Sequence, residues 1–227
     1  MIFSSTDCRL VIFDLDGTLI DTIPDIAAAV DRAFVSLGYA PPGEARARNW
    51  VGNGSKKLIA RALASELGCQ EADLDGKLLA RVQAVFFDCY ETGCQQYSRL
   101  YTGVLPFLQY LEARNVALAC VTNKPQRFTP QVLAGVGIER FFSMVLSGDS
   151  LPECKPHPAP LLAVATEMAV APTEALMVGD SRNDVEAARA AGMPVVCVNY
   201  GYNYGESVEQ LGADRVVGSL MELLATA

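Results

Sequence analysis

From Val116 onward, short apolar runs alternate with segments of helical pattern, and this alternation is the feature that most constrains the fold. The apolar runs are nearly continuous, which is typical of parallel strands buried on both faces. Parallel strands need crossover connections, and the helical segments can supply them. We therefore expect an α/β fold with a doubly wound, Rossmann-like parallel sheet. The expected strands are Leu10–Phe13, Val116–Val121, Met144–Leu146, Ala175–Val178, Pro194–Val198 and Arg215–Val217, and the expected helices are Pro130–Ala134, Pro160–Met168, Asp184–Ala191 and Ser219–Ala225.

A long segment between the first two strands has a different pattern. The stretch Thr22–Leu37 has a proline near its start, apolar residues at helical spacing and a glycine directly after it, which are signals of a helix. Two more amphipathic stretches follow, Ser55–Leu67 and Asp73–Cys89, and no convincing strand occurs among them. We expect a helical cap domain of residues 20–96, inserted after the first strand of a core domain made of residues 1–19 and 97–227.

The charge of the chain limits its partners. The formal net charge is −8 and the isoelectric point is near 4.7, so the surface repels nucleic acid and anionic membranes unless a basic patch offsets it. No apolar stretch approaches the roughly 20 residues of a membrane helix, and the N-terminus lacks the pattern of a signal peptide. We expect a cytoplasmic protein with no nucleic-acid or membrane partner.

Cysteine and histidine usage argues against a disulfide framework and against zinc. The seven cysteines are odd in number and form no Cys-x-x-Cys pair, and His157 is the one histidine. Neither a set of disulfides nor a zinc site is expected from such a pattern.

Polar residues follow four of the expected strands. Each signal alone is ordinary, because Asp-Gly is a common turn dipeptide and a single lysine is usually a solvated surface group. The carboxyl ends of parallel strands, however, line one edge of the sheet, where ligands bind. We therefore expect the four signals to converge on one site. In chain order these residues are Asp14 and Asp16, Thr122 and Asn123, Lys155, and Asp180 and Asp184.

The order Asp-x-Asp, Thr, Lys and an acidic pair resembles the haloacid dehalogenase superfamily. The string FDLDGTL at Phe13–Leu19 matches the nucleophile motif of that superfamily at every position, and VGDSRND at Val178–Asp184 matches its acidic motif. The resemblance covers essentially the whole chain, since the helical insertion suits the members with a helical cap. Within the superfamily, Trp50–Gly54 and Tyr200–Glu206 look like the corresponding strings of bacterial phosphoglycolate phosphatases.

The resemblance implies a chemical role for each motif. Asp14 is expected to be the nucleophile that forms an aspartyl-phosphate, and Asp16 to protonate the leaving oxygen and later activate water. Thr122 and Lys155 are expected to hold and neutralise the transferring phosphoryl group. Thr18 and Asn123 are further residues expected to contact the substrate.

Mg²⁺ is the cofactor that the resemblance implies. Its expected ligands are a carboxylate oxygen of Asp14, the backbone carbonyl of Asp16 and the carboxylate of Asp180, which are oxygen ligands of the kind that a hard cation prefers. Asp184 is expected to act from behind these ligands, by orienting a water or Lys155.

The start of the second cap helix is the expected specificity site. Exposed amides at a helix start attract anions, and Lys56 lies in the first turn, where its charge opposes the helix dipole. We expect Gly52, Asn53, Gly54 and Lys56 to receive a carboxylate of the substrate when the cap closes. The alternative is that Lys56 is a solubilising surface residue.

These expectations together predict a phosphatase that acts on a small phosphate ester, 2-phosphoglycolate above all, with glycolate and phosphate as products. The superfamily's dehalogenases and phosphonatases lack an acid at the position of Asp16, so its presence favours phosphoryl transfer. A sugar phosphate, a nucleotide or pyrophosphate as substrate, a sugar phosphomutase, and a phosphoacceptor signalling domain are alternatives. Both a monomer and a homodimer are compatible with the sequence.

Overall fold

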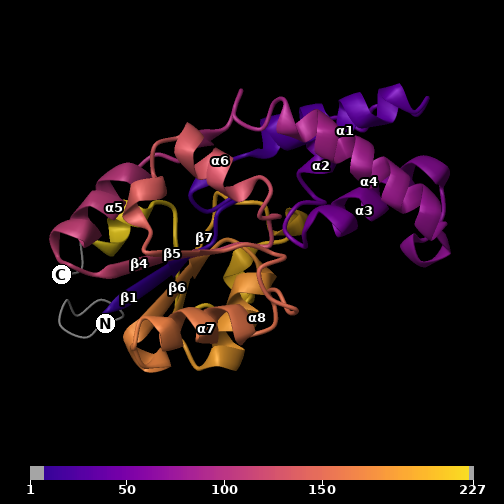
Figure 1. Ribbon diagram of the computed structural model, residues 1–227. Coiled ribbons are helices and arrows are strands. Elements are labelled where there is room, and N and C mark those ends of the chain that lie inside the picture. The colour runs from indigo at the N-terminus through magenta and orange to yellow at the C-terminus, as the bar shows by residue number, and fades with distance from the viewer. Residues whose placement is uncertain (1–7, 225–227) are drawn as a thin grey trace.

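The computed structural model describes residues 8–224, which form an α/β part and a mainly helical part (Figure 1). The α/β part contains a six-stranded sheet with the order β5-β4-β1-β6-β7-β8, in which every neighbouring pair is parallel. The expected parallel α/β fold is therefore confirmed. The strands of this sheet are β1 (Leu10–Phe13), β4 (Ala117–Val121), β5 (Met144–Leu146), β6 (Ala175–Gly179), β7 (Val195–Val198) and β8 (Arg215–Val217).

Helices cover both faces of the sheet, because successive side chains of a strand point to opposite faces. In β1, Val11 and Phe13 join an apolar cluster with α5 (Val104–Ala113) and α6 (Thr129–Gly135). Leu10 and Ile12 join a second cluster with α7 (Ala159–Glu167) and α8 (Arg182–Ala191) on the opposite face (Figure 1). All four β1 side chains are fully buried, which explains why the strand reads as a continuous apolar run.

Most expected helices of the α/β part lie within two residues of their observed bounds, and two points differ. The helix α5 was missed. The helix expected at Ser219–Ala225 was wrong: the chain forms a 3₁₀ turn there, η6 (Leu220–Leu223), in which Glu222 N–H bonds back to Ser219 and Leu224 N–H to Met221; Ala225 lies outside the described residues. The other 3₁₀ turns are η1 (Glu71–Asp73), η2 (Glu139–Phe141), η3 (Pro172–Glu174), η4 (Asn203–Gly205) and η5 (Val208–Gln210).

The segment after β1 is mainly helical, as expected from its periodicity. Its helices are α1 (Ile23–Ser36), α2 (Glu44–Ala47), α3 (Ser55–Leu67) and α4 (Gly76–Glu91). The expectation of no strand was wrong at one point, because β2 (Ile20–Asp21) pairs antiparallel with β3 (Arg99–Leu100). A two-residue strand is too short to give a periodic pattern. This pair holds together the chain segments that enter and leave the helical part.

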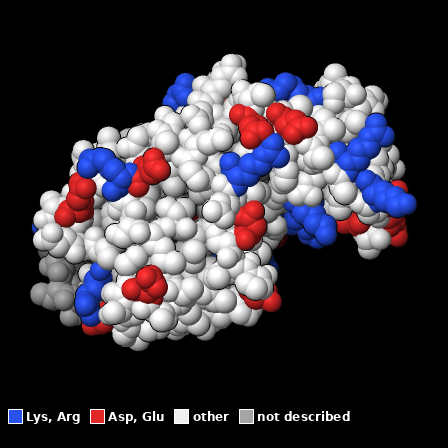
Figure 2. Space-filling model, in the orientation of Figure 1, with Lys and Arg blue, Asp and Glu red and all other residues white. Residues whose placement is uncertain are grey.

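The helical part packs directly on the α/β part (Figure 2). The larger apolar cluster continues from the sheet into α1, α3 and α4. At the start of α1, the hydroxyl of Tyr202 accepts the N–H groups of Thr22 at 2.9 Å and Ile23 at 3.2 Å. The same hydroxyl donates to Asp21 Oδ1 at 2.6 Å. Within the described part of the chain, no helix has the length and apolar character needed to span a membrane.

Candidate active site

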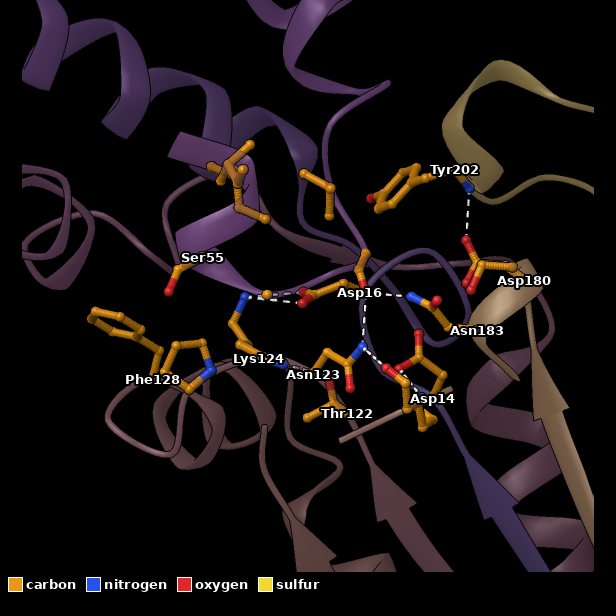
Figure 3. Close-up of a pocket in the computed structure, with 18 of the residues that line it drawn as sticks. Asp14, Asp16, Ser55, Thr122, Asn123, Lys124, Phe128, Asp180, Asn183 and Tyr202 are labelled. Atoms are coloured by element: carbon orange, nitrogen blue, oxygen red, sulfur yellow. Dashed lines mark hydrogen bonds and ion pairs between the residues drawn. The ribbon is translucent and has the colours of Figure 1, made fainter. Parts of the chain in front are cut away.

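The seven residues of the four strand-end signals converge at the carboxyl edge of the sheet, where β1 has β4 on one side and β6 on the other (Figure 3). Asp14 directly follows β1, Thr122 follows β4, and Asp180 follows β6. Residues of α1, α3 and α4 close the opposite side of the same pocket. The residues that line it are Asp14, Asp16, Ile26, Val51, Gly52, Gly54, Ser55, Leu58, Phe86, Tyr90, Thr122, Asn123, Lys124, Pro125, Phe128, Lys155, Asp180, Ser181, Asn183, Asp184, Tyr202 and Asn203.

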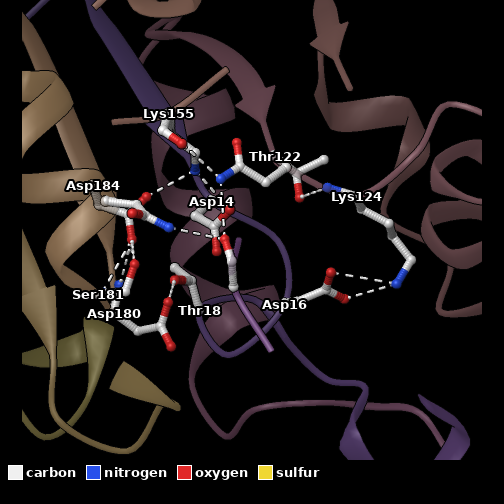
Figure 4. A network of polar contacts seen from close by, with 12 residues as sticks. Asp14, Asp16, Thr18, Thr122, Lys124, Lys155, Asp180, Ser181 and Asp184 are labelled. Carbon is white, nitrogen blue, oxygen red and sulfur yellow. Dashed lines mark hydrogen bonds and ion pairs between the residues drawn. The ribbon is translucent and has the colours of Figure 1, made fainter. Parts of the chain in front are cut away.

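A buried lysine joins two carboxylates at the bottom of this pocket (Figure 4). Lys155 Nζ lies 2.7 Å from Asp14 Oδ1 and 2.7 Å from Asp184 Oδ1. Burial alone lowers the pKa of Lys155, but the charges of Asp14 and Asp184 outweigh it and raise the pKa. Burial also raises the pKa of Asp14 to about 7, with Lys155 opposing and Asp184 adding to the rise. Lys155 therefore stays cationic beside Asp14.

Asp180 is fixed from both sides by the backbone and by a hydroxyl. Its Oδ2 accepts the backbone N–H of Tyr202 at 2.6 Å, and its Oδ1 accepts the hydroxyl of Thr18 at 3.2 Å. The glycines Gly17 and Gly201 approach the carboxylate so closely that a Cβ on either would lie 2.2 Å from Asp180 Oδ2. Burial raises the pKa of Asp180 well above its ordinary value, and the charges of Asp14 and Asp184 add to this.

Asp184 is held at the start of α8. Its Oδ2 accepts the hydroxyl of Ser181 at 2.8 Å and the backbone N–H groups of Ser181 and Asp180 at 3.1 and 3.2 Å. The Asp184 carboxylate thus satisfies two backbone N–H groups where this helix begins. Since Oδ1 binds Lys155, both oxygens of Asp184 are engaged by donors of the protein.

The chemistry of this donor set fits a divalent cation. Oxygens of Asp14, Asp180 and Asp184 lie within 4.8 Å of one another, and hard cations such as Mg²⁺ bind oxygen ligands of this kind. Lys155 contacts two of these carboxylates, Asp14 and Asp184, and no ion pair within the described residues reaches Asp180. When all three carboxylates are ionised, two negative charges therefore stay uncompensated. Burial is the main cause of the raised pKa values of Asp14 and Asp180, and this repulsion adds to it.

Asp16 has a cationic partner that the sequence interpretation missed. Lys124 Nζ lies 3.0 Å from Asp16 Oδ1 and 3.3 Å from Oδ2 (Figure 4). The hydroxyl of Thr22 also donates to Asp16 Oδ1, at 2.6 Å. Burial lowers the pKa of Lys124, but the charge of Asp16 outweighs it and raises the pKa. The Asp16 carboxylate is therefore held between the start of α1 and the end of β4.

Two asparagines of the α/β part connect it to the helical part at the pocket. Asn123 Nδ2 donates to the carbonyl oxygens of Gly52 at 3.0 Å and Lys155 at 2.9 Å. Asn183 Nδ2 donates to the same Gly52 carbonyl at 2.9 Å and to Tyr204 Oη at 2.8 Å. Gly52 has a φ of +121°, which L side chains rarely adopt, and a Cβ there would lie 2.7 Å from Tyr204 Oη, so this position favours glycine.

The remaining expected substrate residues lie in different places. Thr122 is buried, lines the pocket, and its hydroxyl accepts the N–H of Lys124 at 3.1 Å. Thr18 is fully buried beneath Asp180 rather than on the pocket wall. Asn53 lies behind Gly52, where it donates to Asn183 at 3.2 Å. Lys56 is exposed and lies outside the lining.

The sequence interpretation gave no role to several lining residues. Lys124 directly follows Thr122 and Asn123, and Asn183 stands inside the string Val178–Asp184. The position of Lys124 beside Thr122, just after a strand, was a signal that could have identified it. Tyr90 of α4 and Phe128 before α6 carried no local signal. They belong to the site only because the folded chain brings them close to the ends of β4 and β1. Tyr202, which belongs to the string Tyr200–Glu206, lines the pocket as well.

Three comparisons with known proteins agree with this geometry. A phosphoglycolate phosphatase of Pseudomonas putida is 44% identical over 98% of this chain and 81% of its own length. That of Nitrosococcus oceani is 42% identical over 95% of this chain and 94% of its own length. The solved structure of a predicted phosphoglycolate phosphatase from Haemophilus somnus superposes with a TM-score of 0.91 at 35% identity, over 97% of this chain and 98% of that one. The family model described as haloacid dehalogenase-like hydrolase matches residues 11–198, and the chain belongs to that family, as the motifs predicted.

Proposed function

We propose that this protein is a Mg²⁺-dependent phosphatase that hydrolyses 2-phosphoglycolate to glycolate and phosphate. The observation that carries the proposal is the pair formed by buried Asp14 and Lys155, 2.7 Å apart, in the same pocket as the second acid Asp16. A carboxylate nucleophile can approach a phosphate dianion only where positive charge offsets their repulsion. Lys155 supplies such charge next to the attacking group.

In the first half of the reaction, a carboxylate oxygen of Asp14 forms a bond to phosphorus while the ester bond to the glycolate oxygen breaks. Asp16 gives a proton to that leaving oxygen. Thr122 and Lys155 line the pocket beside Asp14 and bind the equatorial oxygens, with Asn123 holding the backbone of Lys155 in place.

In the second half, Asp16 takes a proton from a water as the water oxygen bonds to phosphorus and the bond to Asp14 breaks. Thr22 and Lys124 hold the Asp16 carboxylate for both transfers, through the contacts at 2.6 and 3.0 Å. The products are free phosphate and the restored Asp14.

The residues that would hold Mg²⁺ are Asp14, the backbone carbonyl of Asp16, and Asp180. When bound, the ion neutralises charge that develops on the phosphoryl oxygens. Asp184 orients Lys155, which it contacts at 2.7 Å, and Thr18 orients Asp180 at 3.2 Å. Both are positioning residues in this scheme.

The lining of the pocket combines apolar and polar side chains. Leu58, Phe86 and Phe128 present apolar surface, while Ser55, Asn183 and Asn203 present polar groups. The names of the Pseudomonas putida and Nitrosococcus oceani relatives support 2-phosphoglycolate as the substrate.

Phosphate release from a panel of esters tests the proposal. The panel contains 2-phosphoglycolate, glucose 6-phosphate, pyrophosphate, a nucleoside monophosphate and 4-nitrophenyl phosphate, each measured with and without Mg²⁺. Asp14→Asn removes the nucleophile. Asp88→Asn makes the same chemical change on a side chain that is 78% exposed and serves as the matched control.

We expect 2-phosphoglycolate to give the highest kcat/KM, Asp14→Asn and a chelator to abolish turnover, and Asp88→Asn to keep it. Another ester in the lead would reject the substrate while leaving the Asp14 chemistry in place. Turnover by Asp14→Asn would reject the mechanism itself. Transfer of phosphate to a sugar rather than to water would identify a mutase instead.

A further inference from the structure

Lys124 is a second buried cation in the pocket. It is not needed to offset the negative charge at Asp14, because Lys155 already does so. Among the residues that line the pocket, the cationic side chains are Lys124 and Lys155, and Lys155 is bound to Asp14 and Asp184. Lys124 lies in the loop that follows β4, with its side chain 4% exposed, and Figure 3 shows that side chain reaching Asp16. A lysine that is so deeply buried is normally placed there to pair with an anion.

The hydrogen bonds of Lys124 leave capacity for a further acceptor. An ammonium group has three N–H donors. The hydrogen bonds of Nζ within the described residues go to the Asp16 carboxylate, at 3.0 and 3.3 Å, and Nζ also interacts with the hydroxyl of Tyr90. The ring of Tyr90 covers another side of the ammonium, with 4.8 Å from Nζ to the ring centroid. An anion beside Asp16 would therefore find both charge and a donor.

Tyr90 supplies an independent observation at the same place. The residue comes from α4, lines the pocket and is 2% exposed. Its buried hydroxyl interacts with the charge of Lys124, but in the part of the chain that the structure describes it has no partner in hydrogen-bonding geometry. Because a buried polar group without a partner is costly and uncommon, this hydroxyl indicates a ligand atom that the protein alone does not provide.

We propose that Lys124 and Tyr90 bind the carboxylate of the substrate and so make the enzyme selective for phosphorylated hydroxy acids. The assignment rests on the proposed phosphatase function. In 2-phosphoglycolate the carboxylate carbon is two bonds, roughly 2.4 Å, from the leaving oxygen. Asp16 protonates that oxygen, and Lys124 Nζ lies 3.0 Å from Asp16 Oδ1. A substrate whose leaving oxygen contacts Asp16 can therefore bring its carboxylate, two bonds away, to Lys124.

The surroundings favour Lys124 over Lys56 as the partner of the substrate carboxylate. Leu58, Phe86 and Phe128 line the same pocket, and charge pairs are stronger among apolar groups than in water. Lys56, expected from the sequence to receive the carboxylate, is exposed and outside the lining. The substrate carboxylate therefore binds Lys124 on the side of the sheet, and the helical part contributes Tyr90 of α4.

The test compares two substrates that share a two-carbon skeleton, 2-phosphoglycolate and ethyl phosphate, which lacks the carboxylate. The variants are Lys124→Met, Lys124→Arg and Tyr90→Phe, with Lys56→Met as the matched lysine control, and thermal unfolding checks that each is folded. The quantity measured is the ratio of the two kcat/KM values. This ratio cancels any effect of Lys124 on Asp16, since both substrates need Asp16.

We expect Lys124→Met to lower the ratio about 100-fold, Tyr90→Phe to lower it about 10-fold, and Lys124→Arg to retain more selectivity than Lys124→Met. Lys56→Met should leave the ratio unchanged. Equal losses for both substrates in Lys124→Met overturn the assignment, and so does a loss of selectivity in Lys56→Met alone. Should Lys124→Met not fold, Tyr90→Phe, which removes one oxygen atom, decides in the same way.

Failure of this inference can be told apart from failure of the proposed function. A wild-type enzyme that prefers 2-phosphoglycolate, with variants that keep this preference, rejects only the roles of Lys124 and Tyr90. A wild-type enzyme without activity on 2-phosphoglycolate rejects the proposed substrate, and the inference with it.

Discussion

Replacing Gly201 by alanine is expected to disable the proposed metal site without touching a catalytic group. A Cβ at this position would lie 2.2 Å from Asp180 Oδ2, 2.3 Å from Asp180 Cβ and 2.6 Å from Asp180 Cγ. Cβ contacts below 3.0 Å essentially never occur in real structures, so the carboxylate must move by about 0.8 Å or more. Gly17, whose own Cβ would also meet Asp180 Oδ2, crowds the carboxylate as well.

A displacement near 1 Å in a catalytic site can cost about 100-fold in rate, and changes in the support of metal ligands typically cost 10–100-fold in metal affinity. We therefore expect Gly201→Ala to lower kcat/KM for 2-phosphoglycolate about 100-fold. The Mg²⁺ concentration for half-maximal activity should rise at least about 10-fold. Steady-state kinetics over a Mg²⁺ titration measures both.

Gly76→Ala is the matched control. A Cβ on Gly76 meets no atom within 4 Å, and the residue begins α4, where alanine is favourable. Wild-type activity is expected for this variant. Should folded Gly201→Ala keep kcat/KM within about threefold and an unchanged Mg²⁺ dependence, the reasoning that Asp180 must stay in place to bind the metal is refuted.

Three further predictions concern pH, the start of α1 and the contact between the two parts. Without divalent metal, the free energy of unfolding should fall as pH rises toward about 7, because burial raises the pKa of Asp14 to about 7 and the folded state keeps a proton that the unfolded carboxylate loses at lower pH. In thermal unfolding from pH 5 to 8, the stability of Asp14→Asn should therefore decline less than that of the wild type. Equal slopes would contradict this. Tyr202→Phe should lower the free energy of unfolding by about 1–3 kcal/mol in urea titrations, since two N–H groups at the start of α1 lose their acceptor; a change below about 0.5 kcal/mol would count against that role. Asn183→Ala removes a donor to Gly52 O at 2.9 Å and should lower kcat/KM about 10-fold with little change in melting temperature; unaltered kinetics would show that this contact does not help to close the pocket.

The strand that carries the nucleophile and the chemistry that follows it were predictable from local sequence. Leu10–Phe13 is apolar at every position because both faces of β1 are buried, and the apolar run ends where the acidic motif begins. Helix α3 was predicted at its observed bounds, Ser55–Leu67, because its apolar residues recur at helical spacing and a glycine follows. By contrast, β2 and β3 are two residues each, and a pair this short exists only through its partner strand.

The sequence by itself determined the parallel α/β fold, the helical insertion and the identity of Asp14, Asp16, Lys155 and Asp180 as candidate site residues, because these depend on periodicity and on short motifs. Only the tertiary structure decided that Lys124 pairs with Asp16, 108 residues away in the chain, that Tyr90 reaches the same pocket, and that Lys56 does not. The physical reason is that a charge or a hydroxyl acts through distance and burial, and both are set by how β4, α3 and α4 pack together rather than by the residues that flank each group in sequence.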